Sequence, residues 1–198
     1  MKILFITPYI TTNKHKAFLR NRTGFGLMVY DIANNIGMRE HVDLYAVNAI
    51  APHQIMDNFN TIRNSWLSFL CGIRFSNFLD SLKFLRRYKL PFKDQLRVIY
   101  QHLSVGGLSS KLRGYDIVHI HGCGPITNAA IKLCKRKKIP FCATLHGLVS
   151  FEEQVLLHPS LKQYERDFLV EAYTNDYAVS FISTGNYEQA LAFVKFQH

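Results

Sequence analysis

The chain has 198 residues, of which 48% are hydrophobic and 13% aromatic, enough to form the core of one ordinary globular domain. Charged residues make up 19% and low-complexity tracts are absent, which excludes an intrinsically disordered chain. The formal net charge of +10 favours an anionic partner, namely nucleotide phosphates, an acidic lipid surface or nucleic acid.

The hydrophobic opening of the chain, residues 1–6, is too short for a signal peptide. The longest apolar stretches fall far short of the roughly 20 residues that a membrane-spanning helix needs. The four cysteines show neither a CxxC pair nor zinc-site spacing. We therefore expect a cytoplasmic protein. A peripheral position at the inner face of the membrane is compatible with this location.

The chain begins with the pattern of a βαβ unit. Residues 2–7 form an apolar run that ends at Pro8, which predicts a strand buried on both faces of a parallel sheet. Apolar residues at helical spacing from Phe25 to Ile36 predict a helix that ends near Gly37. Residues 42–47 supply the second strand.

Between Pro52 and Arg113 the strand pattern stops, and apolar stripes at helical spacing replace it. This segment holds ten Lys and Arg against three Asp, so most of the excess positive charge of the chain is local. We interpret residues 52–113 as a basic helical insertion.

Strands and helices alternate again after residue 113, which predicts an α/β fold with a Rossmann-like, doubly wound parallel sheet. The predicted strands are residues 115–121, 140–145 and 177–183, and the predicted helices are roughly residues 125–137, 160–173 and 188–196.

Ligands of open parallel sheets bind outside the carboxyl ends of the strands, where loops and helix amino termini present unpaired N–H groups. We therefore expect His121 and His146 to converge on one edge of the sheet. The strand ends are Thr7-Pro8, His121-Gly122, His146-Gly147 and Ser183-Thr184-Gly185.

His146 is the sharpest candidate for a site residue, because it ends an apolar strand and precedes Gly147. The alternative is a structural histidine. Glu152 and Glu153 follow in a loop that could supply a carboxylate to the same crevice, and the alternative for both is a solvated loop charge.

Gly24 and Gly26 open the first helix, so backbone N–H groups and the helix dipole could hold a phosphate or carboxylate there. The alternative is that they only permit a tight turn. The dinucleotide fingerprint GxGxxG fails at Val29, and the second strand ends at Asn48 without an acidic ribose ligand, which disfavours an NAD enzyme.

Every second residue at the end of one predicted strand is a possible zinc ligand, namely His119, His121 and Cys123. No second cluster of ligand residues lies nearby in the sequence, so we expect no metal. We interpret His119 as a hydrogen-bonded core histidine. Cys123 as a nucleophile would need a base and a lowered pKa, which the sequence does not indicate.

In their order and spacing these motifs resemble the amino-terminal domain of the family-four (group 1) retaining glycosyltransferases of the GT-B fold. The resemblance covers almost the whole chain outside the insertion. It implies that residues 1–198 are one such amino-terminal domain, with residues 52–113 inserted in it. It rests on residues 2–8, the glycine loop and its helix, Asp116-Ile117-Val118-His119-Ile120-His121-Gly122, Ile139-Pro140, Ala143-Thr144-Leu145-His146-Gly147 and residues 178–183.

The resemblance implies transfer of a sugar from a nucleotide-sugar donor to a glycan or lipid-linked acceptor, with retention and without a metal or other cofactor. It implies that Gly24 and Gly26 lie near the donor phosphates and that His146 contacts the donor sugar near the reacting carbon. The residues expected to line the acceptor side of the cleft are His121, Gly122, Gly147, Glu152, Ser183 and Thr184.

The family's carboxyl-terminal domain, which holds donor-binding carboxylates, would begin about where the chain ends at His198. We therefore expect an acceptor-side half whose donor-binding half is absent and which is inactive alone, because leaving-group stabilisation needs both sides of the cleft. Phe25 separates Gly24 from Gly26, whereas the family commonly has a double glycine there.

Several partner classes follow from charge and composition. Aromatic and basic residues alternate from Arg74 to Lys89, which suits an anionic membrane surface, and the alternative is a helical pair with a solvated basic face. Nucleic acid is disfavoured as a partner, because no helix-turn-helix, RRM or zinc signature accompanies the charge. A stand-alone carbohydrate or nucleotide binder that works with a separate partner chain is the other alternative.

Overall fold

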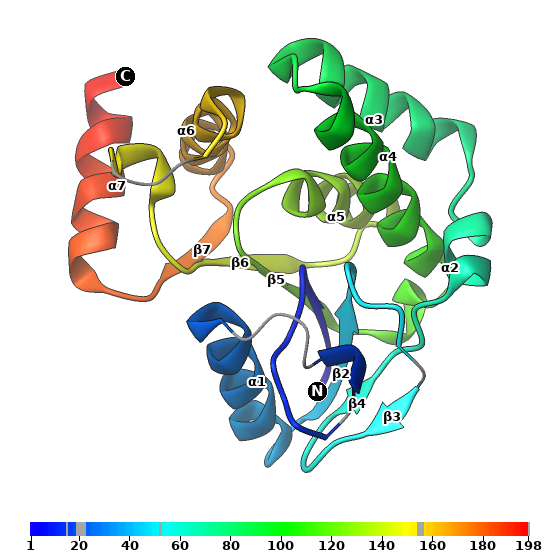
Figure 1. The fold of residues 1–198 in the computed structure, drawn as a ribbon. Coiled ribbons are helices and arrows are strands. Elements are labelled where there is room, and N and C mark those ends of the chain that lie inside the picture. Colours follow the sequence, from blue (N-terminus) through cyan, green and yellow to red (C-terminus); the bar gives the residue numbers. More distant parts are fainter. Residues whose placement is uncertain (15, 19–22, 52, 154–156, 198) are drawn as a thin grey trace.

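The computed structural model describes residues 1–14, 16–18, 23–51, 53–153 and 157–197 (Figure 1). Pro52, where we expected the insertion to begin, and His198, where we expected the domain to end, lie outside the described residues.

The described residues form a seven-stranded sheet with the order β3-β4-β2-β1-β5-β6-β7 (Figure 1). All neighbouring strands are parallel except β3, which pairs antiparallel with β4 at one edge. Without β3 this is the 3-2-1-4-5-6 order of a Rossmann sheet, which confirms the predicted fold class. The strands are β1 Lys2–Thr7, β2 His41–Ala46, β3 Gln54–Ile55, β4 Asn60–Thr61, β5 Ile117–His121, β6 Phe141–Leu145 and β7 Ala178–Phe181.

Helices flank the sheet on both faces (Figure 1). The α-helices are α1 Gly24–Gly37, α2 Trp66–Cys71, α3 Phe75–Tyr88, α4 Phe92–Gly106, α5 Pro125–Lys137, α6 Pro159–Thr174 and α7 Thr184–Gln197. Short 3₁₀ turns are η1 Lys16–Phe18, η2 Gly107–Ser110, η3 Leu112–Gly114 and η4 Val149–Phe151.

Strand β1 shows why the sheet is covered on both faces. Its side chains point alternately to opposite faces. Ile3 and Phe5 belong to the apolar cluster that contains Val29 of α1, whereas Leu4 and Ile6 belong to the cluster that contains the core residues of α4 to α7. The predicted strand with two buried faces is confirmed.

Residues 52–113 contain strands as well as helices, which are α2, α3 and α4. The predicted helical character of this segment is confirmed from residue 66 onward. The prediction that the strand pattern stops there is wrong at its start, because β4 extends the sheet beyond β2 and β3 pairs with β4. Each of these strands is two residues long, too short for an alternating pattern, and Gln54, Asn60 and Thr61 are polar. Their pairing depends on the edge of β2.

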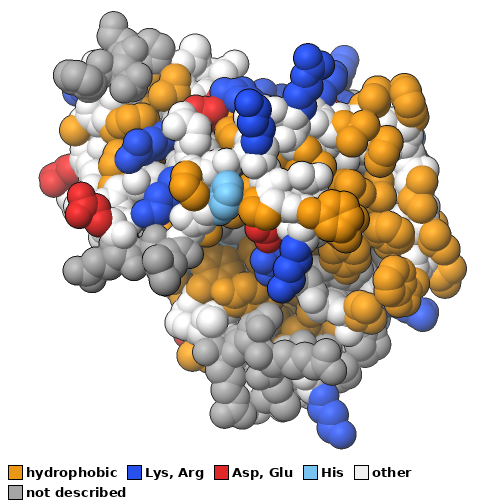
Figure 2. Space-filling view, turned by 45° about the horizontal axis from the view of Figure 1, so that its top comes forward, with side chains coloured by type: hydrophobic (Ala, Val, Ile, Leu, Met, Phe, Trp, Pro, Cys, Tyr) orange, Lys and Arg blue, Asp and Glu red, His pale blue; other side chains and the backbone are white. Residues whose placement is uncertain are grey.

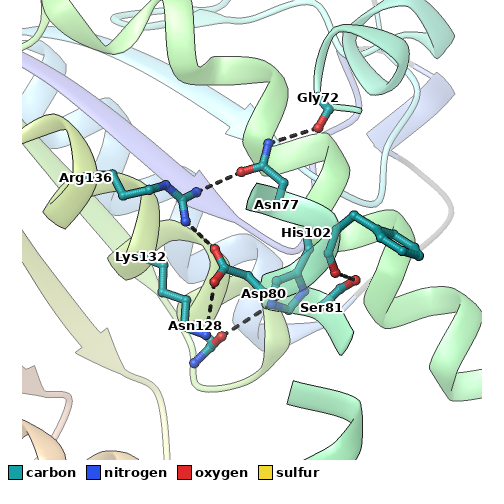
Figure 3. A network of polar contacts seen from close by, with 9 residues as sticks. Gly72, Asn77, Asp80, Ser81, His102, Asn128, Lys132 and Arg136 are labelled. Carbon is teal, nitrogen blue, oxygen red and sulfur yellow. Dashed lines mark hydrogen bonds and ion pairs between the residues drawn. The ribbon is translucent and has the colours of Figure 1, made fainter. Parts of the chain in front are cut away.

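Polar contacts join the helical segment to α5 (Figure 3). The side-chain amide of Asn77 donates to the Gly72 carbonyl at 2.9 Å, and its oxygen accepts from Arg136 Nη2 at 2.8 Å. Asp80 pairs with Arg136 and, at 3.6 Å, with Lys132. Helix α4 also packs along α5. The helices α2 to α4 are therefore an integral layer of the domain.

Candidate functional site

A pocket of about 240 Å³ opens at the carboxyl edge of the sheet. Pro8 follows β1, Gly122 follows β5 and Gly147 follows β6, so the pocket lies at the switch point between β1 and β5, where open α/β sheets bind ligands. Its described lining residues are Pro8, Tyr9, Phe25, Gly122, Cys123, His146, Gly147, Val149 and Glu165.

Gly122 and Gly147 line the pocket where two strands end. Their φ angles are +89° and +152°, backbone conformations that residues with a Cβ rarely adopt. The Gly122 N–H donates to the Thr144 carbonyl at 2.9 Å, which continues the pairing of β5 with β6 one residue past the strand. Glycine at these positions turns the chain sharply and leaves the backbone open to a ligand.

His121 and His146 contact each other beside the pocket. Nδ1 of His121 lies 3.0 Å from Nε2 of His146, within hydrogen-bonding distance. The ring of Phe25 packs edge-on against His146 with the centroids 4.6 Å apart. The other ring nitrogens, Nε2 of His121 and Nδ1 of His146, are buried and have no hydrogen-bond partner within the described part of the chain. The predicted convergence of these two histidines is confirmed.

Burial keeps both rings uncharged. It lowers the pKa of His146 to about 4 and lowers that of His121 well below its ordinary value. The neighbouring rings of His119 and His146 oppose protonation of His121 further, since a second positive charge nearby is unfavourable. Near pH 7 each imidazole therefore offers one N–H donor and one acceptor nitrogen, which suits hydroxyl groups better than phosphates.

His119 lies one step below the pair on the same face of the sheet. Its Nε2 lies 2.6 Å from Thr144 Oγ1, which in turn lies 2.7 Å from Ser180 Oγ. Burial and the nearby His146 lower the pKa of His119 to about 4. The interpretation of His119 as a hydrogen-bonded histidine is confirmed, and it belongs to a polar row that crosses β5, β6 and β7.

Glu165 of α6 lines the pocket, although the sequence pattern did not predict a site residue there. Its side chain is only 4% exposed, and Oε1 accepts the Ser150 N–H at 2.8 Å. Burial raises the pKa of this carboxyl above its ordinary value, although the contacts with the backbone of η4 oppose the shift. A detectable signal was present, because Glu165 interrupts the apolar stripe formed by Leu161, Phe168 and Ala172.

The family model described as Glycosyltransferase Family 4 matches residues 64–183, more than half of the chain and all the site residues from β5 to α6. The chain belongs to glycosyltransferase family 4. A search of curated proteins returns no match.

The amino terminus of α1 approaches the family 4 pocket through Phe25. The N–H of Gly26 donates to Thr23 Oγ1 at 3.2 Å, so it already caps the helix. A side chain on Gly26 would collide with Thr11, whereas Gly24 faces open space. Close packing against Thr11 therefore explains why residue 26 is a glycine. The assignment of Gly24 and Gly26 to the donor phosphates stays a prediction.

Three of the expected cleft residues lie away from this pocket. Glu152 is exposed, and its carbonyl accepts from Lys162 Nζ at 2.6 Å. Ser183 and Thr184 are exposed where β7 meets α7, and Ser183 Oγ caps that helix by accepting the Asn186 N–H at 3.2 Å. The carboxyl group that lines the pocket together with His146 is that of Glu165. A cleft role for Glu152, Ser183 and Thr184 stays a prediction.

Cys123 lines the pocket as a protonated thiol. Burial raises its pKa well above the ordinary value, and the charge of Glu165 acts in the same direction. Among the described residues, no group of three His, Cys, Asp or Glu side chains is arranged to hold a metal ion. The family 4 pocket is thus lined by the neutral His146, which contacts the buried His121 behind it, and by one buried carboxyl group.

Proposed function

We propose that this chain supplies the acceptor-side half of a retaining glycosyltransferase, which moves a sugar from a nucleotide-sugar donor to a glycan or lipid-linked acceptor. The observation that carries this proposal is the uncharged His121–His146 pair beside a pocket at the switch point of the sheet. Membership of glycosyltransferase family 4 supports the reaction class.

The two histidines act as one hydrogen-bonding unit in this proposal. If Nδ1 of His121 donates, His146 accepts on Nε2 and carries its proton on Nδ1. If His146 donates from Nε2, its Nδ1 is an acceptor. His121 thus selects whether Nδ1 of His146 is a donor or an acceptor. Because that nitrogen is buried, we propose that the His146 ring turns toward the pocket when a sugar hydroxyl binds it.

The charge of the pocket argues for an uncharged ligand. The described residues that line it include no Lys or Arg, and Glu165 is their one carboxylic acid. A diphosphate leaving group needs preorganised positive charge and N–H donors. We therefore propose that the donor phosphates bind to groups outside this pocket, that the pocket takes sugar hydroxyls, and that the chain alone does not turn over nucleotide sugars.

The test measures sugar transfer from a panel of nucleotide sugars by the full-length product of the reading frame and by this chain. We expect retention of anomeric configuration in the product of the full-length protein and no turnover by the chain. His146→Ala should lower kcat/KM by about 10²-fold or more.

His41→Ala is the matched control. His41 begins β2 at the opposite edge of the sheet, its side chain is 52% exposed, and its loss should leave kcat/KM unchanged. Unchanged turnover in His146→Ala would remove His146 from the site. Saturable binding of a neutral oligosaccharide to the chain, without transfer by the full-length protein, would instead support a stand-alone binding module.

A further inference from the structure

Large apolar side chains gather on the outer surface of helices α2, α3 and α4. Phe75 is 77% exposed, Phe92 73% and Trp66 66%. Figure 2 shows this gathering on the side of the molecule where the three helices lie, with Lys and Arg side chains beside it. We call this surface the α2–α4 face, and its apolar residues are Trp66, Leu67, Leu70, Ile73, Phe75, Phe78, Leu82, Phe92 and Leu96.

Helix α3 carries apolar side chains on its outer face as well as on its inner face. The inner face buries Phe84 and Tyr88 together with the polar Asn77 and Ser81. Phe75, Phe78 and Leu82 lie exposed at positions i, i+3 and i+7 of the outer face. Packing of α3 on its own domain uses the inner face and leaves this outer apolar stripe uncovered. Contiguous exposed apolar surface of this kind marks an interaction site.

Unpaired cations surround the apolar residues. In the described part of the chain, no carboxylate forms an ion pair with the five exposed side chains of Lys83, Arg86, Lys89, Lys93 and Arg97. The stretch from residue 63 to residue 97 contains two acids, Asp80 and Asp94. Asp80 turns inward to Arg136 and Lys132. The α2–α4 face is therefore strongly positive.

We propose that the α2–α4 face docks on the surface of an anionic lipid bilayer. Lys is depleted in protein–protein interfaces, yet three of the five unpaired cations here are lysines. Basic residues near an anionic bilayer each contribute attraction, and their long stems let the charges reach the headgroups while Trp and Phe insert below. No helix in the described residues is long and apolar enough to span the bilayer, so the contact is peripheral.

The amino-terminal half of α4 places one end of this face on the pocket side of the sheet, whereas the segment after α2 packs at the other end of α4, against Leu103. Nε2 of His102 lies 3.3 Å from Oδ1 of Asn128, in the first turn of α5 just after β5 ends. Helix α4 starts ten residues earlier, at Phe92, so it extends about 15 Å beyond that point. The Phe92 end of the α2–α4 face is therefore the part that lies nearest the pocket edge. The docking itself does not depend on the proposed sugar transfer.

Vesicle co-sedimentation of the 198-residue chain tests the proposal. We expect several-fold higher recovery with vesicles of phosphatidylcholine plus phosphatidylserine than with phosphatidylcholine alone. We expect this difference to shrink when salt is raised from about 0.15 M to about 1 M, because salt screens surface charge. Equal recovery with both vesicle types would overturn the proposal.

Two pairs of variants locate the contact. Phe75→Ser with Phe92→Ser should abolish recovery, whereas Ile55→Ser, which removes a side chain 76% exposed on β3, should not change it. Lys89→Glu with Lys93→Glu should weaken binding by about fivefold or more for each residue, or about 1 kcal/mol. The matched control is Arg39→Glu, an exposed cation outside the α2–α4 face. All of these positions are exposed, so thermal unfolding should show unchanged stability.

Analytical ultracentrifugation distinguishes a protein occupant. A monomer that sediments with anionic vesicles agrees with the proposal. A dimer that the Phe75→Ser and Phe92→Ser variant dissociates, with no recovery on vesicles, would show that a second copy covers this face and would overturn the proposal. Full vesicle binding by that double variant would overturn it as well.

Discussion

Glu165 is a buried acid on a helix face that is otherwise apolar. Burying a carboxyl group is unfavourable unless hydrogen bonds compensate, and here the Ser150 N–H donates to it at 2.8 Å. Arg166, the next residue, also bonds to η4, because its guanidinium donates to the Ser150 carbonyl at 2.9 Å. These two side chains fix η4 against α6, and η4 begins two residues after Gly147.

Replacing Glu165 tests this positioning role. Glu165→Ala should lower the free energy of unfolding by about 1–3 kcal/mol, because the buried Ser150 N–H loses its acceptor. Glu165→Gln keeps an oxygen at the same place and should cost clearly less. Urea unfolding of both variants measures the difference. Equal losses in the two variants would mean that the hydrogen bond to Ser150 does not hold the loop.

At the scale of elements, glycines set how closely the helices α2, α3 and α4 approach one another. A Cβ on Gly72 would collide with the Leu103 carbonyl of α4, and one on Gly106 would collide with the Asn77 side chain of α3. Asn77 is the residue that also links α3 to α5 through Arg136. Close backbone approach and the polar network of Figure 3 thus hold the same helices.

Gly106→Ala should destabilise the protein by about 1–3 kcal/mol, because the added methyl group overpacks the contact between α4 and α3. This outcome opposes helix propensity, since Ala is more favourable than Gly in a helix by about 1 kcal/mol. Gly185→Ala in α7 is the matched control. Its Cβ meets no atom within 4 Å, so it should stabilise the protein by up to about 1 kcal/mol in thermal or urea unfolding. Stabilisation by both substitutions would contradict the close approach of α3 and α4.

Over the whole molecule, the two halves of the sheet bury different chemistry. Strands β1 and β2 bury apolar side chains on both faces. On β5 to β7, one face instead carries the polar row of His119, Thr144 and Ser180, next to the His121–His146 pair. Neutral histidines in this half couple the stability of the domain to pH.

Acid should therefore destabilise the folded chain. Burial lowers the pKa of His119 and His146 from 6.5 to about 4, so between these values the unfolded chain binds more protons than the native one. The stability contribution is complete above about pH 6.5 and is lost as the pH falls toward 4, with a slope of up to about 1.4 kcal/mol per pH unit for each histidine.

Urea unfolding at about pH 7 and pH 5 measures this slope, and His119→Gln should reduce it by about one proton. Comparing variant with wild type cancels the opposite contribution of Glu165, whose raised pKa acts in the other direction. The same loss of stability in both proteins would mean that His119 is not buried in its neutral form.

The sequence by itself predicted the strands β1, β2, β5, β6 and β7 and most of the helices around them. It also predicted that His121 and His146 meet, because both end parallel strands and such ends share one edge of a sheet. These features follow from local periodicity and from one rule of topology, so they need no knowledge of which side chains touch.

Only the tertiary structure decided the remaining features. Strands β3 and β4 form because β2 offers an edge to pair with, and Glu165 enters the pocket because α6 packs beside η4. The polar Asn77 of α3 is buried because it meets Arg136 of α5 on the inside. In each case the partner lies many residues away in the chain. Periodicity predicts on which face of a helix or strand a side chain lies, but it does not predict which other element packs against that face.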